Sequence, residues 1–123
     1  MILVDTSVRV DHLRRTSPEL SGQLLTQRVL MHPYVRGELA CRNLHTRIEL
    51  LKLFDDLPFS AVATDNEVMF YIEKHTLMGK GIGYVDAHLL TATSLTQSAK
   101  LWTRDNGLAA LAHRLRIDYS TSR

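Results

Sequence analysis

Short apolar runs alternate along the chain with longer segments in which apolar residues recur every three or four positions. The short runs have the length and the branched aliphatic content of buried strands, whereas the longer segments have the period of helices. Five runs predict strands: residues 1–5 (MILVD), 28–32 (RVLMH), 59–63 (FSAVA), 100–103 (KLWT) and 116–119 (RIDY).

The segments between these runs predict helices. Two of them begin with a Thr that is followed three residues later by a Glu, the signature of a capping box: Thr16 with Glu19 and Thr64 with Glu67. Glycines at 79, 81 and 83 interrupt the pattern between two of the helices. The predicted helices cover residues 7–14, 16–25, 33–44, 48–54, 64–77, 84–97 and 107–115.

Strands that alternate with helices, without a hairpin signal between them, are typical of a parallel sheet covered on both faces. The chain contains no internal repeat, low-complexity tract or linker. The pattern therefore predicts an α/β fold, a three-layer α/β/α sandwich with a mostly parallel central sheet, formed by residues 1–123 as a single domain.

The composition is that of a globular chain. Of the 123 residues, 45% are hydrophobic and 23% are charged, enough for one core without disulfides. No apolar run approaches the roughly 20 residues of a membrane span. The chain opens with MILVDTS rather than a signal-peptide pattern, so we expect a cytoplasmic protein. Cys41, the single cysteine, is predicted to be a small buried side chain.

Four acidic residues stand where the predicted topology brings strand ends and helix starts together. Asp5 ends the first strand and Asp105 follows KLWT, while Glu38 and Asp86 lie in the helices after VLMH and the glycine stretch. Because the carboxyl ends of parallel strands share one edge of a sheet, all four carboxylates are expected to converge there. Taken singly, each has an ordinary alternative role as a helix N-cap or a solvated helix residue.

A shared site explains the four acids together. Carboxylates within a few ångströms of one another raise each other's pKa values unless a cation compensates. An all-oxygen ligand set suits Mg²⁺ or Mn²⁺, and such an ion can activate a water molecule and stabilise the charge that builds on a phosphodiester. Asp5, Glu38, Asp86 and Asp105 are therefore the candidate metal ligands and catalytic residues.

Hydroxyl and amide side chains flank two of these acids. Thr6 and Ser7 follow Asp5, and Thr103 and Asn106 stand on either side of Asp105. These side chains can hydrogen-bond the carboxylates or a phosphate, or they can cap the helices that follow. The sequence leaves both roles open.

With these residues identified, the chain resembles PIN-domain proteins and, among them, the VapC toxins of bacterial toxin–antitoxin pairs. Four stretches carry the resemblance through nearly the whole chain: MILVDTSV at the start, HPYVRGELA around Glu38, GIGYVDAHLLTA around Asp86 and LWTRDNGLA around Asp105. It implies a Mg²⁺- or Mn²⁺-dependent endoribonuclease that cuts structured RNA, transfer RNA included, in single-stranded loops. It also implies a homodimer and a VapB-type antitoxin that blocks the active-site groove.

Binding RNA at a formal net charge of only +2 requires basic side chains gathered around the groove. Arg9, Arg14, Arg36 and Arg104 lie near the predicted active edge and are candidate contacts to RNA or to the antitoxin; for each, the alternative is a solvated side chain. Tyr84 is a further candidate, because its ring can stack on an unpaired base. Arg9 and Tyr84 also depart from the family pattern, in which an aromatic residue and Trp are common at their places.

The first two predicted helices carry more apolar residues than one face of a sheet needs. This apolar stripe predicts either additional core or a groove for a partner helix. It comprises Val10, Leu13, Leu20, Leu24 and Leu25.

Two other functions fit parts of the pattern. A phosphohydrolase of the haloacid-dehalogenase kind also has an Asp at the end of its first strand, but it requires a second Asp two residues on, where Ser7 stands. A catalytically inactive PIN-fold protein that regulates by binding RNA or a partner is the remaining alternative. Such a protein would have no reason to keep four acids that repel one another.

Overall fold

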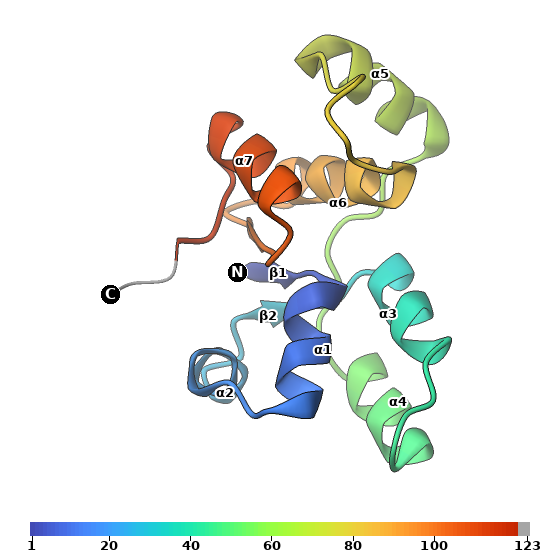
Figure 1. Cartoon of the computed structure of the whole chain (residues 1–123), viewed down its shortest axis with the longest axis vertical. Coiled ribbons are helices and arrows are strands. Elements are labelled where there is room, and N and C mark those ends of the chain that lie inside the picture. The colour runs from blue at the N-terminus through green and yellow to red at the C-terminus, as the bar shows by residue number, and fades with distance from the viewer. Residues whose placement is uncertain (121–123) are drawn as a thin grey trace.

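Three parallel strands form the centre of the computed structural model, which describes residues 1–120 (Figure 1). The strand β1 (Ile2–Val4) lies between β2 (Val29–Leu30) and β3 (Lys100–Trp102) and pairs with both. Leu3 is the residue opposite both Leu30 and Leu101. The strand that opens the chain is therefore the central one, and its carboxyl end has a neighbouring strand end on either side.

Helices connect the strands and surround the sheet. Their order and approximate positions are those that the hydrophobic pattern predicts. They are α1 (Thr6–Arg14), α2 (Pro18–Leu25), α3 (Pro33–Ala40), α4 (Arg47–Asp55), α5 (Asp65–His75), α6 (Tyr84–Leu95) and α7 (Asn106–Arg114).

The two faces of the sheet are covered by different helices, as Figure 1 shows. Alternate residues of β1 point to opposite faces. Ile2 and Val4 belong to a buried cluster with Val8 of α1 and Leu20 of α2. Leu3 belongs to a second cluster that includes Leu89, Leu90 and Leu108, from α6 and α7. This arrangement confirms the predicted α/β/α sandwich with a parallel sheet.

Two of the predicted strands are reduced to single bridges. Residues 59–63 pair only through Met31 and Phe59, and residues 116–119 only through Leu101 and Asp118. The first has little to pair with, because β2 ends just before His32 begins α3 as its N-cap. The strand prediction is therefore wrong for most of FSAVA and RIDY, and the sheet is narrower than the sequence suggests.

One of the two predicted capping boxes forms. Thr64 and Glu67 exchange hydrogen bonds with each other's backbone N–H at 3.1 and 2.8 Å. The other is wrong: the N-cap of α2 is Ser17, whose hydroxyl accepts a bond from the N–H of Leu20 at 3.3 Å. Pro18 occupies the start of the helix, so the residue directly before it must be the cap.

Cys41 also differs from its prediction. It is exposed, because it is the C-cap of α3, where the chain leaves the core for the loop before α4. Within residues 1–120, none of the helices has both the length and the apolar character that crossing a membrane requires.

The two candidate caps of α2 give a direct test of this local structure. Replacing Ser17 by Ala should lower the free energy of unfolding by about 1 kcal/mol, because a backbone N–H of the first turn loses its acceptor. Thr16→Ala is the matched control and should change it by less than about 0.5 kcal/mol. Urea unfolding followed by circular dichroism measures both, and a larger effect at Thr16 would contradict the assignment.

Candidate active site

The carboxyl edge of the sheet collects the acidic residues that the sequence singles out. Asp5 directly follows β1 and caps α1, and Asp105 follows β3 and caps α7. Glu38 lies in α3, the helix after β2, and Asp86 lies in the first turn of α6. Asp5 is buried, Asp86 is half-buried, and Glu38 and Asp105 are exposed.

Asp5 is held in place by three donors. Its Oδ1 accepts a hydrogen bond from the N–H of Thr6 at 2.7 Å. Its Oδ2 accepts from the hydroxyls of Ser7 at 3.0 Å and Thr103 at 2.7 Å. These donors come from α1 and from the end of the neighbouring strand, so the orientation of the carboxylate depends on how β1 and β3 pair.

Two threonines connect Asp5 to Glu38 and Asp105. The hydroxyl of Thr6 donates to Oε1 of Glu38 at 2.5 Å, across from α1 to α3. The hydroxyl of Thr103 accepts from the backbone N–H of Asp105 at 3.0 Å while it donates to Asp5. Thr6, Ser7 and Thr103 thus belong to one hydrogen-bond network, and Asn106 occupies the first position of α7.

The surroundings of Asp86 disfavour its charged form. Burial raises the pKa of Asp86, the N–H of Gly83 at 3.3 Å lowers it, and the charges of Asp5, Asp105 and Glu38 raise it further. Asp86 therefore lies within electrostatic reach of the other three carboxylates at this edge.

The loop before α6 has the conformation that its glycines allow. Gly79 and Gly81 adopt φ angles of 69° and 79°, a region that other residues rarely occupy. The loop ends at Gly83, the N-cap of α6, whose N–H holds the carboxylate of Asp86. The glycine stretch thus leads directly into the candidate site.

The chemistry of this donor set fits a hard divalent cation. All four side chains offer carboxylate oxygens, and within residues 1–120 none of the four forms a salt bridge. Among the same residues, however, no three His, Cys, Asp or Glu side chains are arranged as ligands around one point. Metal binding by these acids therefore stays a prediction, supported by donor chemistry and mutual repulsion rather than by a preformed cage.

Arg9 lies in the interior instead of facing RNA or an antitoxin, and it is only 5% exposed. Its guanidinium donates to the carbonyls of Val4 at 3.1 Å and Leu30 at 2.8 Å, at the ends of β1 and β2. Burial lowers the pKa of Arg9 to about 10, and the charge of Asp5 acts in the opposite direction. The prediction of a ligand contact or a solvated side chain at Arg9 is wrong, because the strand ends present carbonyls that need a donor.

Two other candidate RNA contacts are engaged with acids of the chain itself. Arg36 pairs with Asp55 at 3.0 Å and Arg104 with Asp11 at 2.8 Å, both partly exposed. The hydroxyl of Tyr84 donates to Asp65, which leaves the ring exposed.

A cluster of rings between α3 and α6 escaped the sequence reasoning. His32 and His88 are both buried, and the Tyr34 and Tyr84 rings lie 4.6 and 4.7 Å from that of His88, between centroids. Nδ1 of His32 accepts from the N–H of Tyr34 at 3.0 Å, so His32 is the N-cap of α3. The position of His32 directly before Pro33 was the available signal that His32 caps α3, just as Ser17 directly before Pro18 caps α2.

No family model matches the chain. The chain is 41% identical over 110 residues to Ribonuclease VapC32 of Mycobacterium tuberculosis, from the strain CDC 1551 / Oshkosh and equally from the strain ATCC 25618 / H37Rv. The match covers 89% of this chain and 89% of the relative.

The buried cap of α3 predicts a loss of stability in acid. Burial and the nearby His88 lower the pKa of His32 from 6.5 to about 4. Between these values the unfolded chain binds a proton that the folded chain excludes, so stability falls as the pH is lowered through this range. Protonation would also place a hydrogen on the Nδ1 that accepts from Tyr34.

We expect His32 to account for up to about 3 kcal/mol of unfolding free energy lost between pH 6.5 and 4. His32→Asn keeps a capping acceptor but does not titrate, so this variant should lose less over the same range. Urea unfolding at both pH values measures the difference. Equal acid sensitivity of the two proteins would contradict the role given to His32.

Proposed function

Because the chain belongs to the VapC family of PIN-domain ribonucleases, we propose that it is a Mg²⁺- or Mn²⁺-dependent endoribonuclease toxin of a type II toxin–antitoxin system. The observation that carries the proposal is the hydrogen-bond network at the carboxyl edge of the sheet, in which Thr6 links Asp5 to Glu38 and Thr103 links Asp5 to the backbone of Asp105. The protein would work in the cytoplasm, where its RNA substrate is found.

Asp5, Glu38, Asp86 and Asp105 are proposed to hold the cation. When bound, a divalent ion lowers the pKa of a water molecule and offsets the negative charge that develops on the phosphodiester. The chain's own contribution is positioning: Asp5 is oriented by three donors. Asp86 is carried by α6, most of which is buried. Thr6 and Thr103 then align Glu38 and the backbone of Asp105 with Asp5.

Two exposed rings on the helices that carry Glu38 and Asp86 suit an unpaired RNA substrate, transfer RNA loops included. Tyr34 of α3 and Tyr84 of α6 are exposed, and both pack against His88. Aromatic faces at such a place stack on bases that are free of pairing partners. A duplex would hide its bases from these rings, which favours cleavage in single-stranded loops.

The partner is proposed to be a VapB-type antitoxin that contributes an apolar helix. An apolar cavity of about 420 Å³ opens between α1, α2 and α4, lined by Leu13, Leu20, Leu24, Leu50, Leu53 and Phe54 among others. Leu13, Leu20 and Leu24 of the apolar stripe predicted from the sequence line this cavity. A homodimer, expected from the family, stays a prediction.

Loss of a single carboxylate should abolish cleavage. We expect Asp5→Asn or Asp86→Asn to lower the cleavage rate by about 100-fold or more, since changing mere supporting residues around a metal costs about 10–100-fold. Chelation of divalent ions by EDTA should have the same effect. The matched control is Asp56→Asn, at an exposed position at the end of α4. Full activity of both site variants, with circular dichroism unchanged, would reject the site.

Mn²⁺ binding can be tested apart from cleavage. Addition of Mn²⁺ should raise the melting temperature of the wild type and of Asp56→Asn, because a ligand that binds only the folded state stabilises it. Asp86→Asn should show little of this rise. An equal rise in all three proteins would place the ion elsewhere.

The toxin and partner assignments can be tested in cells. Expression alone should arrest growth, and co-expression of the small protein encoded next to this chain should restore it. Leu53→Lys, which places a charge in the apolar cavity, should weaken the rescue but not the arrest, because a docked apolar helix would bury that charge. Leu25→Lys is the control: Leu25 is 85% exposed, Leu53 is 60% exposed, and only Leu53 lines the cavity.

Unaffected growth during confirmed expression would contradict the toxin assignment. Equal rescue of the two variants would contradict the antitoxin site.

A further inference from the structure

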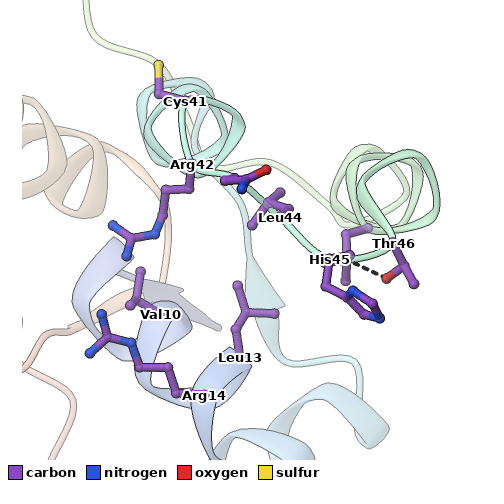
Figure 2. Close-up of a pocket in the computed structure, with 10 residues that line it drawn as sticks. Val10, Leu13, Arg14, Cys41, Arg42, Leu44, His45 and Thr46 are labelled. Atoms are coloured by element: carbon purple, nitrogen blue, oxygen red, sulfur yellow. Dashed lines mark hydrogen bonds between the residues drawn. The ribbon is translucent and has the colours of Figure 1, made fainter.

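A second and larger pocket, of about 740 Å³, opens between α1 and the connection from α3 to α4. Its walls come from Val10, Leu13 and Arg14 of α1 and from residues 41–46 of the connection (Figure 2). We refer to it as the basic pocket, because two of the residues that line it are Arg14 and Arg42.

The two arginines reach into the basic pocket from opposite walls. Figure 2 shows their guanidinium groups turned to the same side of the pocket, near Val10. Both side chains are exposed, and no acidic residue lines the pocket. Within residues 1–120 neither guanidinium forms a hydrogen bond or an ion pair, whereas Arg36 and Arg104 are paired with aspartates. The pocket therefore carries positive charge that the described chain does not neutralise.

The pocket also has an apolar wall that is well supported. Val10, Leu13, Leu44 and Leu50 contribute to it, and Val10 lies next to the two guanidinium groups in Figure 2. Arg47 donates to the carbonyls of Ala40 at 2.6 Å and of residue 42 at 3.0 Å, which braces the connection that forms one wall. An aliphatic surface next to two cations matches a nucleotide, whose flat base is apolar on its faces and whose phosphates are anionic.

One face of α1 joins the basic pocket to the candidate active site. Thr6, Val10 and Arg14 are spaced four residues apart and so lie on the same side of the helix. Thr6 binds Glu38 of α3, and Arg42 lies two residues beyond the end of that helix. At a rise of about 1.5 Å per residue, Arg14 lies about 12 Å along α1 from Thr6. A strand of RNA leaving the carboxylates would therefore reach the pocket within a few nucleotides.

We propose that the basic pocket binds one unpaired nucleotide of the RNA substrate next to the cleavage site, with its base on the apolar wall and the flanking phosphates on Arg14 and Arg42. This inference rests on the proposed ribonuclease function. An acidic segment of a protein partner could form the same ion pairs. The continuity of the pocket with Glu38 through Thr6 favours the substrate instead.

The test compares R14Q/R42Q with Arg28→Gln, which removes a charge from an exposed position outside the pocket. Binding of a short unstructured oligoribonucleotide is measured in EDTA by fluorescence anisotropy at several salt concentrations. The double variant should bind at least about tenfold more weakly at low salt. The slope of the logarithm of the association constant against the logarithm of the salt concentration should become less steep by about 1.4, since each of two single-strand phosphate contacts contributes about 0.7. Arg28→Gln should match the wild type.

Removal of the base tests the apolar wall separately. Abasic substitutions along the oligoribonucleotide should reveal one position that costs the wild type about 5-fold or more in affinity, because the base then loses its apolar contact with the wall. In cleavage assays with Mg²⁺, the double variant should lose kcat/KM mainly through a higher KM.

Cys41, the single cysteine, lies at the rim of the pocket with its thiol turned away from the arginines (Figure 2). A fluorophore attached to Cys41 should therefore change its emission when RNA binds.

The outcomes separate the two proposals. If the wild type neither binds nor cuts RNA, the proposed function fails and this inference fails with it. If the wild type cuts RNA but R14Q/R42Q binds it as tightly as Arg28→Gln does, only the pocket is rejected. Loss of antitoxin binding with unchanged RNA affinity would instead reassign the pocket to the protein partner.

Discussion

The carboxylate of Asp5 joins the fold of this protein to its candidate active site. Asp5 ends the central strand, and its oxygens accept bonds from Thr6, Ser7 and Thr103, which come from α1 and the end of β3. The position of this one side chain therefore depends on the pairing of the whole sheet. Since Thr6 also holds Glu38 and Thr103 also accepts from the N–H of Asp105, the sheet sets the positions of these two acids as well.

Bringing these acids together disfavours the charged form of Asp86, and the fold offsets this effect only in part. Burial and three neighbouring carboxylates raise the pKa of Asp86, against a single stabilising bond from Gly83. Arg9 supplies a positive charge near Asp5, but its hydrogen bonds go to the carbonyls of Val4 and Leu30 rather than to an acid. Arg9 thus secures the strand ends on which the carboxylates stand and leaves their oxygens to other donors. The remaining negative charge is what a divalent cation would balance.

The sequence predicted what depends on local pattern and on general rules of sheet topology. The order of the elements, the Thr64 capping box and the meeting of Asp5 and Asp105 at one edge follow from periodicity and parallel pairing. It did not predict Arg9, because burial of a guanidinium depends on which carbonyls remain unpaired at the strand ends, and these are known only after folding. The extent of the sheet was wrong for a similar reason: His32 ends β2 early by capping α3, which leaves residues 59–63 with a single partner.

The distribution of charge explains how a nearly neutral chain can act on a polyanion. A formal net charge of +2 suggests weak attraction for RNA, yet it is the sum of regions with opposite character. Along one face of α1, Thr6 stands at the acidic centre and Arg14 stands at the basic pocket, two turns of the helix away. An acidic centre repels a phosphodiester until a cation binds. Positive side chains that lie away from the carboxylates must therefore hold the RNA. The exposed guanidinium groups of Arg14 and Arg42 meet this requirement, because they lie within the reach of a short RNA strand and no aspartate of the described chain pairs with them.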